Sequence, residues 1–331
     1  MSILVTGGAG YIGSHTVRRL RADGADVVVL DSLEYGHPQS IPGLPLVVAD
    51  ITDREAVLAA CNDHGVTQAV HFAAYKSVGE SMQHPTKYWL NNVAGTVQLV
   101  DALLQAGVDQ IVFSSSCSVN GTPESVPVTE DMPIAPESVY AESKVMVERI
   151  LAWYGTTDDV RAVSLRYFNA AGATDDGQFG EVWERSINLI PMVMKATLGL
   201  GPPLQVFGAD YPTPDGTCIR DYIHVDDLAD AHVRALDYLA AGGATVSLNV
   251  GTGVGTSVLE VINATERITG RSVPYEIVAR RPGDPVATYA DPTRIATTLG
   301  WRSTKSLDDI VRSAWAWHST HPHGYDAVER P

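Results

Sequence analysis

Cysteine is scarce in this chain, which has three, Cys61, Cys117 and Cys218, widely separated and odd in number. This pattern argues against a disulfide framework and, without a CxxC pair or a histidine-rich cluster, against a zinc site. Long apolar runs are missing too, since none reaches the roughly 20 residues that a membrane-spanning helix needs. Met1 leads directly into the strand-like Ile3–Val5 instead of a basic and then apolar leader. We therefore expect a protein of the reducing cytoplasm with no metal and no membrane partner.

Positive charge is also in short supply. Lysine and arginine together number 23 against 39 acidic residues, so the formal net charge is −16. Such a surface repels polyanions, which argues against nucleic acid and anionic membranes as partners. A small anionic ligand is compatible with this charge only if arginines gather locally to hold it.

The bulk composition is that of a packed globular protein, with 45% hydrophobic and 19% charged residues. The sequence contains no low-complexity tract and no internal repeat. Its 331 residues exceed the size of a typical single domain, which indicates one large domain and a smaller partner.

The first half of the chain alternates short apolar segments with helix-like segments. Such alternation predicts an α/β fold built on a doubly wound, Rossmann-like parallel sheet that helices cover on both faces. The expected strands are Ile3–Thr6, Val27–Leu30, Leu46–Ala49, Val70–Phe72, Ile111–Ser115 and Ala162–Leu165. The expected helices are Tyr11–Asp23, Asp53–Gly65, a segment around Asn91–Gly107, and Tyr140–Tyr154.

Beyond Asn169 this rhythm gives way to stretches rich in glycine and proline, such as Gly199–Pro203 and Tyr211–Gly216. Interruptions of this kind suit a smaller α/β domain at the carboxyl edge of the sheet, where doubly wound folds bind their ligands. We expect a dinucleotide-binding domain over residues 1–168 and a mainly substrate-binding domain over residues 169–331. The chain is expected to return to the first domain around residues 216–240.

Glycines stand at three spaced positions, Gly7, Gly10 and Gly13, directly after the first expected strand and at the start of a helix. Residues without a Cβ permit the tight turn and let the backbone approach a pyrophosphate, to which the helix N-terminus presents N–H groups. Asp31 ends the second strand, where a carboxylate accepts hydrogen bonds from the adenosine ribose and repels the 2′-phosphate of NADP. The motif and the acid together predict NAD as the cofactor.

A second motif joins a phenol and an ammonium, because Tyr140 and Lys144 are four residues apart and share one face of the expected helix. A free tyrosine titrates at about pH 10, so it is a poor base at neutrality. We expect the ammonium and a positively charged nicotinamide to lower the pKa of Tyr140 toward neutrality. Ser114–Ser116 ends an expected strand at the same edge, where a hydroxyl can bond a substrate oxygen and relay its proton. Tyr140, Lys144 and Ser116 are the candidate catalytic residues.

Together these motifs resemble the extended short-chain dehydrogenase/reductase superfamily. Within it, the chain is similar to the UDP-glucose 4-epimerase family over almost its whole length, from Ser2 to near Gly324. The more specific similarities lie in the segments Thr6–His15, His71–Ser81, Leu165–Gly172, Asp221–Asp230 and Arg280–Asp284.

The resemblance implies two sets of ligand-binding residues. NAD would be bound by Tyr11, Ile12, Asp50, Ile51, Phe72, Ala73, Ala74, Lys76, Asn91, Ser114 and Phe168, together with Gly7, Gly10, Gly13, Asp31, Tyr140 and Lys144. The UDP-sugar would be held by Lys76, Ser116, Tyr140, Asn169, Asn188, Phe207, Arg220, Arg281, Asp284 and Thr288. The chemistry agrees, because the guanidinium groups of Arg220 and Arg281 match a diphosphate and Phe207 offers a flat face for uracil.

The activity that the resemblance implies is interconversion of UDP-glucose and UDP-galactose by transient oxidation at C4, in a homodimer built by two helices from each subunit. Alternatives are a 4-epimerase of a UDP-uronic acid or UDP-pentose, a nucleotide-sugar 4,6-dehydratase, and an NAD-sensing protein without catalysis. The dehydratases usually carry an Asp-Glu pair where this chain has Cys117-Ser118. The intact Ser116, Tyr140 and Lys144 set disfavours the sensor.

The chain departs from the family pattern in two places. Val119–Gly121 carries Asn120 where the family commonly has tyrosine, and Glu181–Ile187 lacks the usual Asp/His/Pro pattern. Both departures bear on substrate preference more than on the reaction.

A further position, Thr288, lies four residues beyond Asp284. The resemblance implies that this residue is a gate beside the sugar's C2 substituent, and a small side chain there leaves room for an N-acetyl group. We therefore expect UDP-N-acetylglucosamine and UDP-N-acetylgalactosamine as additional substrates. The alternative is an alignment shifted by one residue, which would put Tyr289 at the gate and close it.

Overall fold

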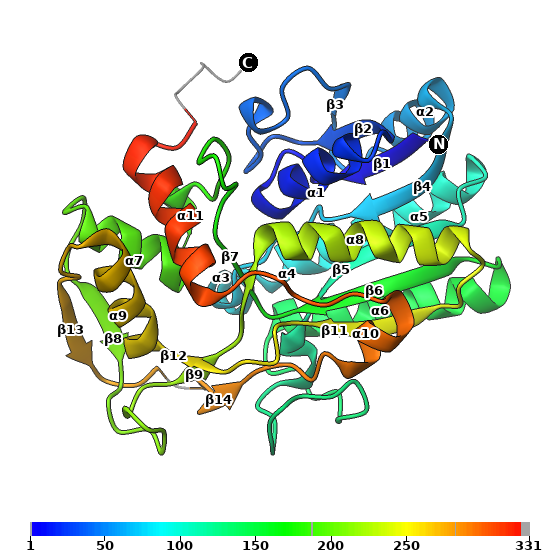
Figure 1. The fold of residues 1–331 in the computed structure, drawn as a ribbon. Helices are drawn as coiled ribbons and strands as arrows, with labels where there is room; N and C mark the ends of the chain where they lie inside the picture. Colours follow the sequence, from blue (N-terminus) through cyan, green and yellow to red (C-terminus); the bar gives the residue numbers. More distant parts are fainter. Residues whose placement is uncertain (1, 187, 282, 326–331) are drawn as a thin grey trace.

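A parallel sheet of seven strands forms the centre of the molecule (Figure 1). The computed structural model describes residues 2–186, 188–281 and 283–325. In sheet order the strands are β11 (Val246–Val250), β6 (Arg161–Tyr167), β5 (Gln110–Ser116), β4 (Val66–His71), β1 (Ser2–Thr6), β2 (Asp26–Asp31) and β3 (Leu46–Val48). This order confirms the predicted doubly wound sheet, and every expected strand lies in it.

Helices cover both faces of this sheet. One face carries α1 (Tyr11–Ala22), α8 (Val225–Ala240) and α10 (Thr293–Leu299). The other face carries α2 (Arg54–His64), α5 (Thr96–Gln105) and α6 (Val139–Thr157). Because the strands are buried from both sides, they read as continuous apolar runs in the sequence.

The helix expected around Asn91–Gly107 has two parts. A π-helical turn, η2 (Trp89–Gly95), follows α3 (Val78–Gln83) and α4 (Pro85–Tyr88) and leads directly into α5. Asn92, buried in this turn, accepts the Tyr75 N–H at 2.9 Å and donates to the Tyr75 carbonyl oxygen at 3.0 Å. The turn thereby fastens the segment after β4 to the helix layer, and such turns are frequent at functional sites.

The second half of the chain returns to the main sheet before it completes a smaller lobe. β7 (Asn169–Ala171) pairs with β10 (Tyr222–His224), and β10 leads through α8 to the edge strand β11. The strand β11 therefore extends the sheet that the first half of the chain begins. The division into residues 1–168 and 169–331 stays a prediction, and residues 326–331 lie outside the described part of the chain.

The smaller lobe lies at the left of Figure 1. Its helices are α7 (Leu189–Thr197), α9 (Val258–Thr269) and α11 (Leu307–Thr320), which share one apolar core. Its strands are the pair β8 (Leu204–Phe207) and β13 (Tyr275–Val278), and the three-stranded sheet of β12 (Thr256–Ser257), β9 (Ile219–Arg220) and β14 (Ala287–Thr288).

A buried carboxylate joins the lobe to the sheet. Asp221, between β9 and β10, has an exposure of 0%. Its Oδ1 accepts the N–H and the hydroxyl of Thr252 at 2.9 and 2.7 Å, and its Oδ2 accepts the N–H groups of Gly253 and Ala290 at 3.0 and 3.1 Å. Burial raises the pKa of Asp221, and these four donors oppose the rise. The carboxylate thus holds the segments after β11 and β14 against the strand that carries Arg220.

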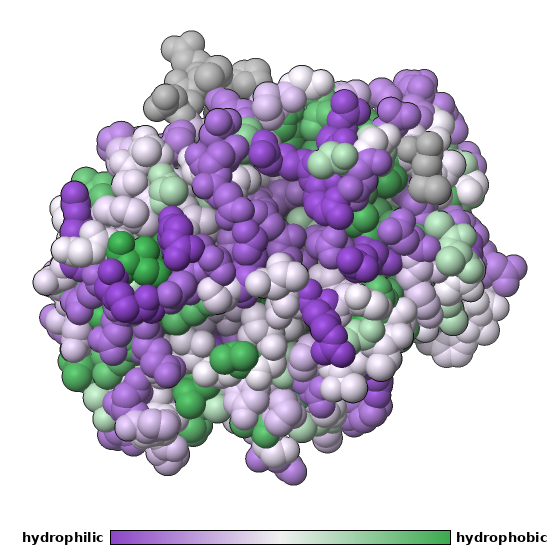
Figure 2. Space-filling model, in the orientation of Figure 1, coloured by the Kyte–Doolittle hydropathy of each residue, from purple (hydrophilic) through white to green (hydrophobic). Residues whose placement is uncertain are grey.

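The molecular surface in Figure 2 is largely hydrophilic, with apolar residues in small separate patches. The exposed apolar side chains include Leu90 on η2, Val97 on α5, and Met146 and Trp153 on α6. Within residues 2–186, 188–281 and 283–325, no helix is both long enough and apolar enough to cross a bilayer.

Candidate active site

The glycine turn joins β1 to α1 and lies against the end of β4. Gly7 has a φ of +71°, and a Cβ there would lie 2.6 Å from the backbone nitrogen of Ala73. A Cβ on Gly13 would lie 2.3 Å from the carbonyl oxygen of Gly7, so the helix packs on the turn only because no side chain intervenes. Gly10 is the N-cap of α1 and contributes no side-chain hydrogen bond. The first N–H groups of this helix are therefore suited to an anionic ligand.

Asp31 ends β2 beside this turn and is buried. Its Oδ2 accepts the N–H of Ala9 and its Oδ1 accepts the N–H of Leu33, both at 2.9 Å. Burial raises the pKa of Asp31, and the two backbone donors oppose the rise. Each carboxylate oxygen keeps a lone pair for a further donor, which suits the predicted contact with a ribose.

Asp50 and Ile51 follow β3, the neighbour of β2, at the same edge of the sheet. Asp50 is exposed, and its Oδ1 accepts the N–H and the hydroxyl of Thr52 at 2.8 and 2.7 Å. Ile51 is buried against Gly95, where an added Cβ would lie 3.0 Å from the Ile51 side chain. Both residues therefore lie on the Asp31 side of the glycine turn.

The segment after β4 carries four of the residues that the resemblance assigns to NAD. The Phe72 ring packs 4.7 Å from the His232 ring of α8, while Ala73 and Ala74 are half-buried at the sheet edge. Lys76 is exposed, and its Nζ lies 3.3 Å from Oε1 of Glu181. Asn91 belongs to η2, further along the chain, and its Nδ2 donates to Oδ1 of Asn92 at 3.0 Å.

The three candidate catalytic residues meet at the ends of β5 and α6. Lys144 is buried, donates from Nζ to the Ser114 carbonyl oxygen at 2.7 Å, and lies 5.8 Å from the centre of the Tyr140 ring. Tyr140 forms a hydrogen bond with Ser116. The Ser116 Oγ also lies 2.9 Å from the Oγ of Ser118. A phenol, an ammonium and a hydroxyl are thus gathered within one small volume.

Burial controls the protonation of this group in the protein alone. It raises the pKa of Tyr140 to about 12, although the bond with Ser116 opposes the rise. It lowers the pKa of Lys144 to about 7, although the Glu148 carboxylate opposes the fall. Our expectation that the ammonium lowers the pKa of Tyr140 toward neutrality is therefore wrong for the protein without a cofactor, because desolvation of the phenolate is the larger effect.

Ser114 and Phe168 flank this group. The Ser114 Oγ accepts a hydrogen bond from the Tyr167 hydroxyl, and Phe168 is buried with Val128 and Ala290. Sequence reasoning missed Tyr167 as a neighbour of the site. Its only signal was its place in the segment Leu165–Gly172.

Four residues predicted to hold the UDP-sugar lie together in the smaller lobe. Arg220 donates from Nη1 to the carbonyl oxygens of Ile219 and Pro285 at 2.8 and 2.9 Å, and its Nη2 lies 3.6 Å from Oδ1 of Asp284. The Arg281 guanidinium lies 3.7 Å from the centre of the Phe207 ring and covers one of its faces. Pro282, within the same motif, lies outside the described residues.

Thr288 lies next to Arg220, because the two residues are register partners in the parallel pair of β14 and β9. Its Oγ1 is buried and has no hydrogen-bond partner among the described residues. Asn169, at the start of β7, donates its N–H and its side-chain amide to the Asp221 carbonyl oxygen at 3.0 and 2.9 Å.

Glu181 links two further predicted residues, and sequence reasoning gave it no role. Its carboxylate is buried and accepts from Lys76 Nζ at 3.3 Å and from Asn188 Nδ2 at 3.0 Å. Trp317 of α11 fixes the Glu181 backbone through a bond of 2.9 Å to the carbonyl oxygen. The segment Glu181–Ile187 had been singled out for its departure from the family pattern, and Ile187 lies outside the described residues.

The other departure, Asn120, is buried in the 3-10 turn η3 (Cys117–Asn120) and ties it to the following loop. Its Nδ2 donates to the Pro133 carbonyl oxygen at 3.1 Å. Cys117, at the start of the same turn, packs against the cluster that contains Ala290, two residues after Thr288, the register partner of Arg220. The serine strand and the arginine-bearing lobe therefore face each other across one site.

One histidine-carboxylate cluster in the described part of the chain has the composition of a metal site. The ligand atoms of Asp175, His224 and Asp226 lie within 4.8 Å of one another. Both ring nitrogens of His224 are engaged, Nδ1 with the N–H of Asp226 at 3.1 Å and Nε2 with Ser313 Oγ at 3.0 Å. Lys305 Nζ lies 2.7 Å from Oδ2 of Asp175. The lysine supplies the cation here, and we assign no metal to the cluster.

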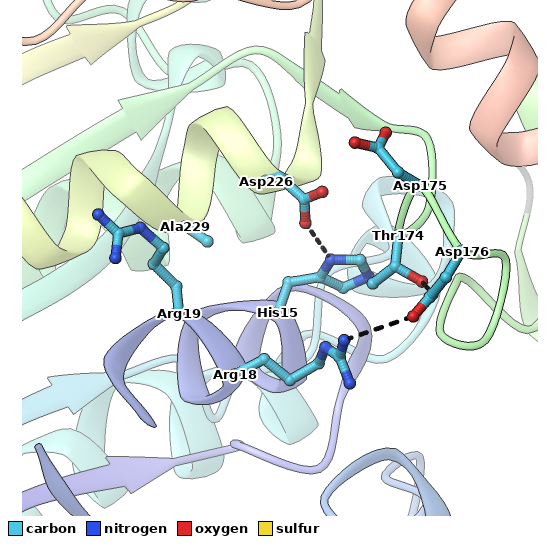
Figure 3. Close-up of a pocket in the computed structure, with 8 residues that line it drawn as sticks. All are labelled: His15, Arg18, Arg19, Thr174, Asp175, Asp176, Asp226 and Ala229. Carbon is cyan, nitrogen blue, oxygen red and sulfur yellow. Dashed lines mark hydrogen bonds and ion pairs between the residues drawn. The ribbon is translucent and has the colours of Figure 1, made fainter. Parts of the chain in front are cut away.

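Figure 3 shows the pocket that adjoins this cluster, between α1 and α8. It is lined by His15, Arg18, Arg19, Thr174, Asp175, Asp176, Asp226 and Ala229. His15 Nδ1 lies 2.7 Å from Oδ1 of Asp226, and Arg18 Nη2 lies 4.0 Å from Oδ2 of Asp176. The other charged groups of the pocket, Arg19 and Asp175, pair with residues outside it. Because its charged groups already have partners, we place no ligand in this pocket.

The edge formed by β1, β2 and β4 fits the predicted dinucleotide. The glycine turn allows a close backbone approach that a Cβ would prevent. Beside it, each oxygen of the buried Asp31 carboxylate can accept a further hydrogen bond. The nearby Tyr140 and Lys144 supply the groups that a hydride-transfer site requires.

Comparison with known proteins gives relatives over the full length. The model of the NAD dependent epimerase/dehydratase family matches residues 3–251. A UDP-glucose 4-epimerase of Lactobacillus helveticus is 42% identical over 98% of this chain and 99% of its own length.

Solved structures agree. The UDP-glucose 4-epimerase of Stenotrophomonas maltophila, crystallised with NAD and formylated UDP-arabinopyranose, is 42% identical with a TM-score of 0.94, over 97% of this chain and 99% of that one. The UDP-Glc/GlcNAc 4-epimerase of Campylobacter jejuni is 38% identical with a TM-score of 0.84, over 96% of this chain and 99% of that one.

The buried Lys144 leads to a prediction about stability and pH. Its pKa is about 7 in the fold against 10.5 ordinarily, so the unfolded chain binds the additional proton between these values and stability falls as the pH drops from 10 to 7. Lys144→Met removes this dependence. We compare the free energies of unfolding of the variant and the wild type, both without dinucleotide. The variant's value minus the wild-type value should be about 3 kcal/mol larger at pH 7 than at pH 10.

Urea unfolding across this pH range measures the effect. Lys195→Met, at a half-buried lysine of α7, is the matched control and should follow the wild-type pH dependence. Parallel pH curves for Lys144→Met and wild type would contradict the prediction.

Proposed function

The chain belongs to the NAD dependent epimerase/dehydratase family, and from this premise we propose that it interconverts UDP-glucose and UDP-galactose with tightly bound NAD. The observation that carries the proposal is the meeting of Tyr140, Lys144 and Ser116 beside the glycine turn, facing the lobe that bears Arg220. Such a reaction has no net redox change, so the enzyme is an isomerase.

The residues divide the chemical work between them. Tyr140 takes the proton of the sugar's C4 hydroxyl, and Ser116 bonds both that oxygen and the phenol. Lys144, held by the Ser114 carbonyl oxygen, stabilises the phenolate that Tyr140 must become. NAD, when bound beside these residues, would supply a hydride acceptor and donor for C4, and its oxidised form would add a positive charge that favours the phenolate of Tyr140.

The substrate's charge is met by local arginines on an acidic protein. Arg220 and Arg281 offer guanidinium groups to the diphosphate, and the half-buried Phe207 ring offers a flat surface for uracil. Substrate held through its UDP portion leaves the sugar able to turn while the intermediate stays in the site. Retention of the dinucleotide through turnover is consistent with this arrangement.

The rival reactions fit the site less well. Dehydration needs an acid and a base beside the serine, and Cys117-Ser118 occupies that place. Burial raises the pKa of the Cys117 thiol to about 12, so it does not replace an ionised carboxylate. UDP-uronic acids and UDP-pentoses remain alternative substrates for the same 4-epimerase chemistry, and they are compared directly in the assay below.

We also propose that UDP-N-acetylhexosamines are substrates, because of Thr288. Register partners in parallel strands project to the same face, so Thr288 shares the face of Arg220 while Tyr289 projects to the other. Tyr289 packs at Gly255, where an added Cβ would lie 2.9 Å from its ring. The unpartnered Thr288 hydroxyl can bond a substituent on the sugar. A 38% identical relative is named a UDP-Glc/GlcNAc 4-epimerase.

We propose that the chain forms a homodimer whose interface is the layer of η2, α5 and α6. Leu90 and Val97 are seven residues apart, as are Met146 and Trp153, so each pair shares one side of its helix. Trp153 is 68% exposed and Leu90 is 62% exposed. Because η2 packs against both α5 and α6, these exposed apolar side chains lie on neighbouring elements, as in association surfaces. A cytoplasmic location is proposed with it, favoured by the three free thiols.

Purified protein should convert UDP-galactose to UDP-glucose without added NAD. Tyr140→Phe should lower turnover about 10²–10⁴-fold, because only the proton-accepting oxygen is lost. Sugar nucleotides resolved by chromatography give the rate, and UDP-glucuronate and a UDP-pentose tested in parallel rank the alternatives. Near-normal turnover in Tyr140→Phe would show that another group is the base, and absence of conversion by wild type would reject the proposed function.

Thr288→Tyr should abolish turnover of UDP-N-acetylgalactosamine while sparing UDP-galactose. Thr288→Ser keeps the gate small and serves as the control, with both substrates turned over. Steady-state rates on the two substrates decide the matter. If wild type does not turn over the N-acetylated sugar, the gate hypothesis fails and Tyr289 becomes the candidate.

Trp153→Asp should weaken self-association about 100-fold, since it places a charge in the apolar centre of the proposed interface. Sedimentation should give wild type twice the chain mass of 35.4 kDa and the variant an increasing share of single chains on dilution. Ile277→Asp, at an exposed apolar residue of β13, should leave the mass unchanged. A wild-type protein that sediments as one chain would reject the dimer.

A further inference from the structure

Two loops that follow different strands meet outside the glycine turn. The Tyr75 hydroxyl, after β4, donates to Oε2 of Glu34, after β2, at 2.6 Å. Lys87 Nζ lies 3.8 Å from the centre of the Tyr75 ring and 3.9 Å from Oε1 of Glu34. The Tyr35 ring packs edge-on against the Tyr75 ring at 6.0 Å. None of these residues belongs to the sets that the resemblance assigns to NAD or to the UDP-sugar.

The sheet order determines what this contact crosses. β1 lies between β2 and β4, so a bond from the loop after β2 to the loop after β4 must pass across the end of β1. The glycine turn begins at that end. Any dinucleotide that reaches from Asp31 to the catalytic tyrosine follows the same edge of the sheet, outside the strand ends.

The contact lies on the solvent side of this path. The glycine turn is largely buried, whereas Glu34 and Tyr35 are exposed and the Glu34–Tyr75 bond is an exposed one. Tyr75 also interacts electrostatically with Asp50, so the bond lies near the edge where Asp31 ends β2 and Asp50 follows β3. A dinucleotide whose adenosine half reaches Asp31 would therefore pass beneath this bond, between the bond and the sheet edge.

The backbone of each loop that forms the contact is held to the rest of the fold. The Tyr75 backbone is held by the two bonds to Asn92. On the other side, the loop from Ser32 to His37 folds tightly back on Asp31, because a Cβ at Gly36 would lie 2.7 Å from Asp31 Oδ1. The His37 N–H then donates to the Ala9 carbonyl oxygen at 2.9 Å. Opening the path therefore requires the side-chain contact to break, since the bases of both loops are tied to the fold.

Lys87 joins the contact to the helix layer. Its Nζ donates to Oε1 of Glu80 at 2.9 Å and to the Tyr35 hydroxyl at 3.4 Å. Burial and the bond to Glu34 raise the pKa of Tyr75, so its hydroxyl keeps its proton and remains a donor. The Lys87 ammonium thus lies over the Tyr75 ring, near the Glu34 carboxylate, and is bonded to the Glu80 carboxylate. These residues therefore form a connected network rather than a single surface bond.

We propose that Glu34, Tyr75 and Lys87 form a clasp over the adenosine half of the bound dinucleotide and slow its release. The inference rests on the proposed function, which requires NAD to stay in place through the transient oxidation. The clasp acts on the rate of dissociation, because it must open before the dinucleotide leaves. It takes no part in the chemistry at C4.

The test measures the release of NAD from purified holoenzyme. Protein loaded with NAD is mixed with an excess of an enzyme that destroys free NAD, and the NAD still bound is quantified over time. Tyr75→Phe removes only the bridging oxygen, and Glu34→Ala removes its partner in an exposed loop. Each should raise the release rate about tenfold, the effect of losing one hydrogen bond to a charged group. Tyr238→Phe, at a half-buried tyrosine of α8, is the matched control and should release NAD at the wild-type rate.

The double variant separates a shared bond from two unrelated effects. If both residues act through the same bond, Tyr75→Phe combined with Glu34→Ala releases NAD no faster than the faster single variant. Wild-type release rates in both single variants, with NAD still bound at equilibrium, would overturn the clasp and leave the proposed function standing. Wild-type protein that neither contains nor binds NAD would overturn the proposed function and the clasp together.

Discussion

The arrangement of the site depends on the hydrogen bonds that one buried carboxylate, Asp221, accepts. Asp221 is sealed from solvent, and its carboxylate is tolerable there only because four donors from two other segments converge on it. Those donors come from the end of the edge strand β11 and from the end of β14. The backbone of the same residue accepts both bonds from Asn169. One buried carboxylate thus sets how the arginine-bearing strand β9 lies against the main sheet, which carries Ser116 at the end of β5.

The sequence was informative where the determinants are local. The doubly wound sheet followed from the alternation of apolar runs with helical segments. The glycine turn and the Tyr140/Lys144 pair were readable because their spacing alone places them on one turn or one helix face. Even Thr288 and Arg220, far apart in the chain, were assigned to one ligand by resemblance, and the structure makes them register partners. The assignment of each predicted residue to a ligand atom stays a prediction.

What the sequence did not reveal depends on long-range packing. Glu181 reads as an ordinary acid until the fold buries it between Lys76 and Asn188. The balance of effects on Tyr140 was misjudged for the same reason, because the degree of burial is a property of the assembled lobe and sheet. Nothing in the sequence pairs Glu34 with Tyr75, and only the position of β1 between β2 and β4 gives their contact a meaning.

The pairing of β9 with β14 places Arg220, which we propose binds the diphosphate, and Thr288, which we propose lies beside the sugar, on adjacent strands in fixed register. Binding of the nucleotide and selection of the sugar therefore depend on two neighbouring but separate side chains of one small sheet. A single codon change can replace Thr288 and leave Arg220 unchanged. The range of accepted sugars can therefore change during evolution while binding of the nucleotide is retained. Enzymes with this arrangement are expected to differ in breadth among close relatives more readily than in the nucleotide that they accept.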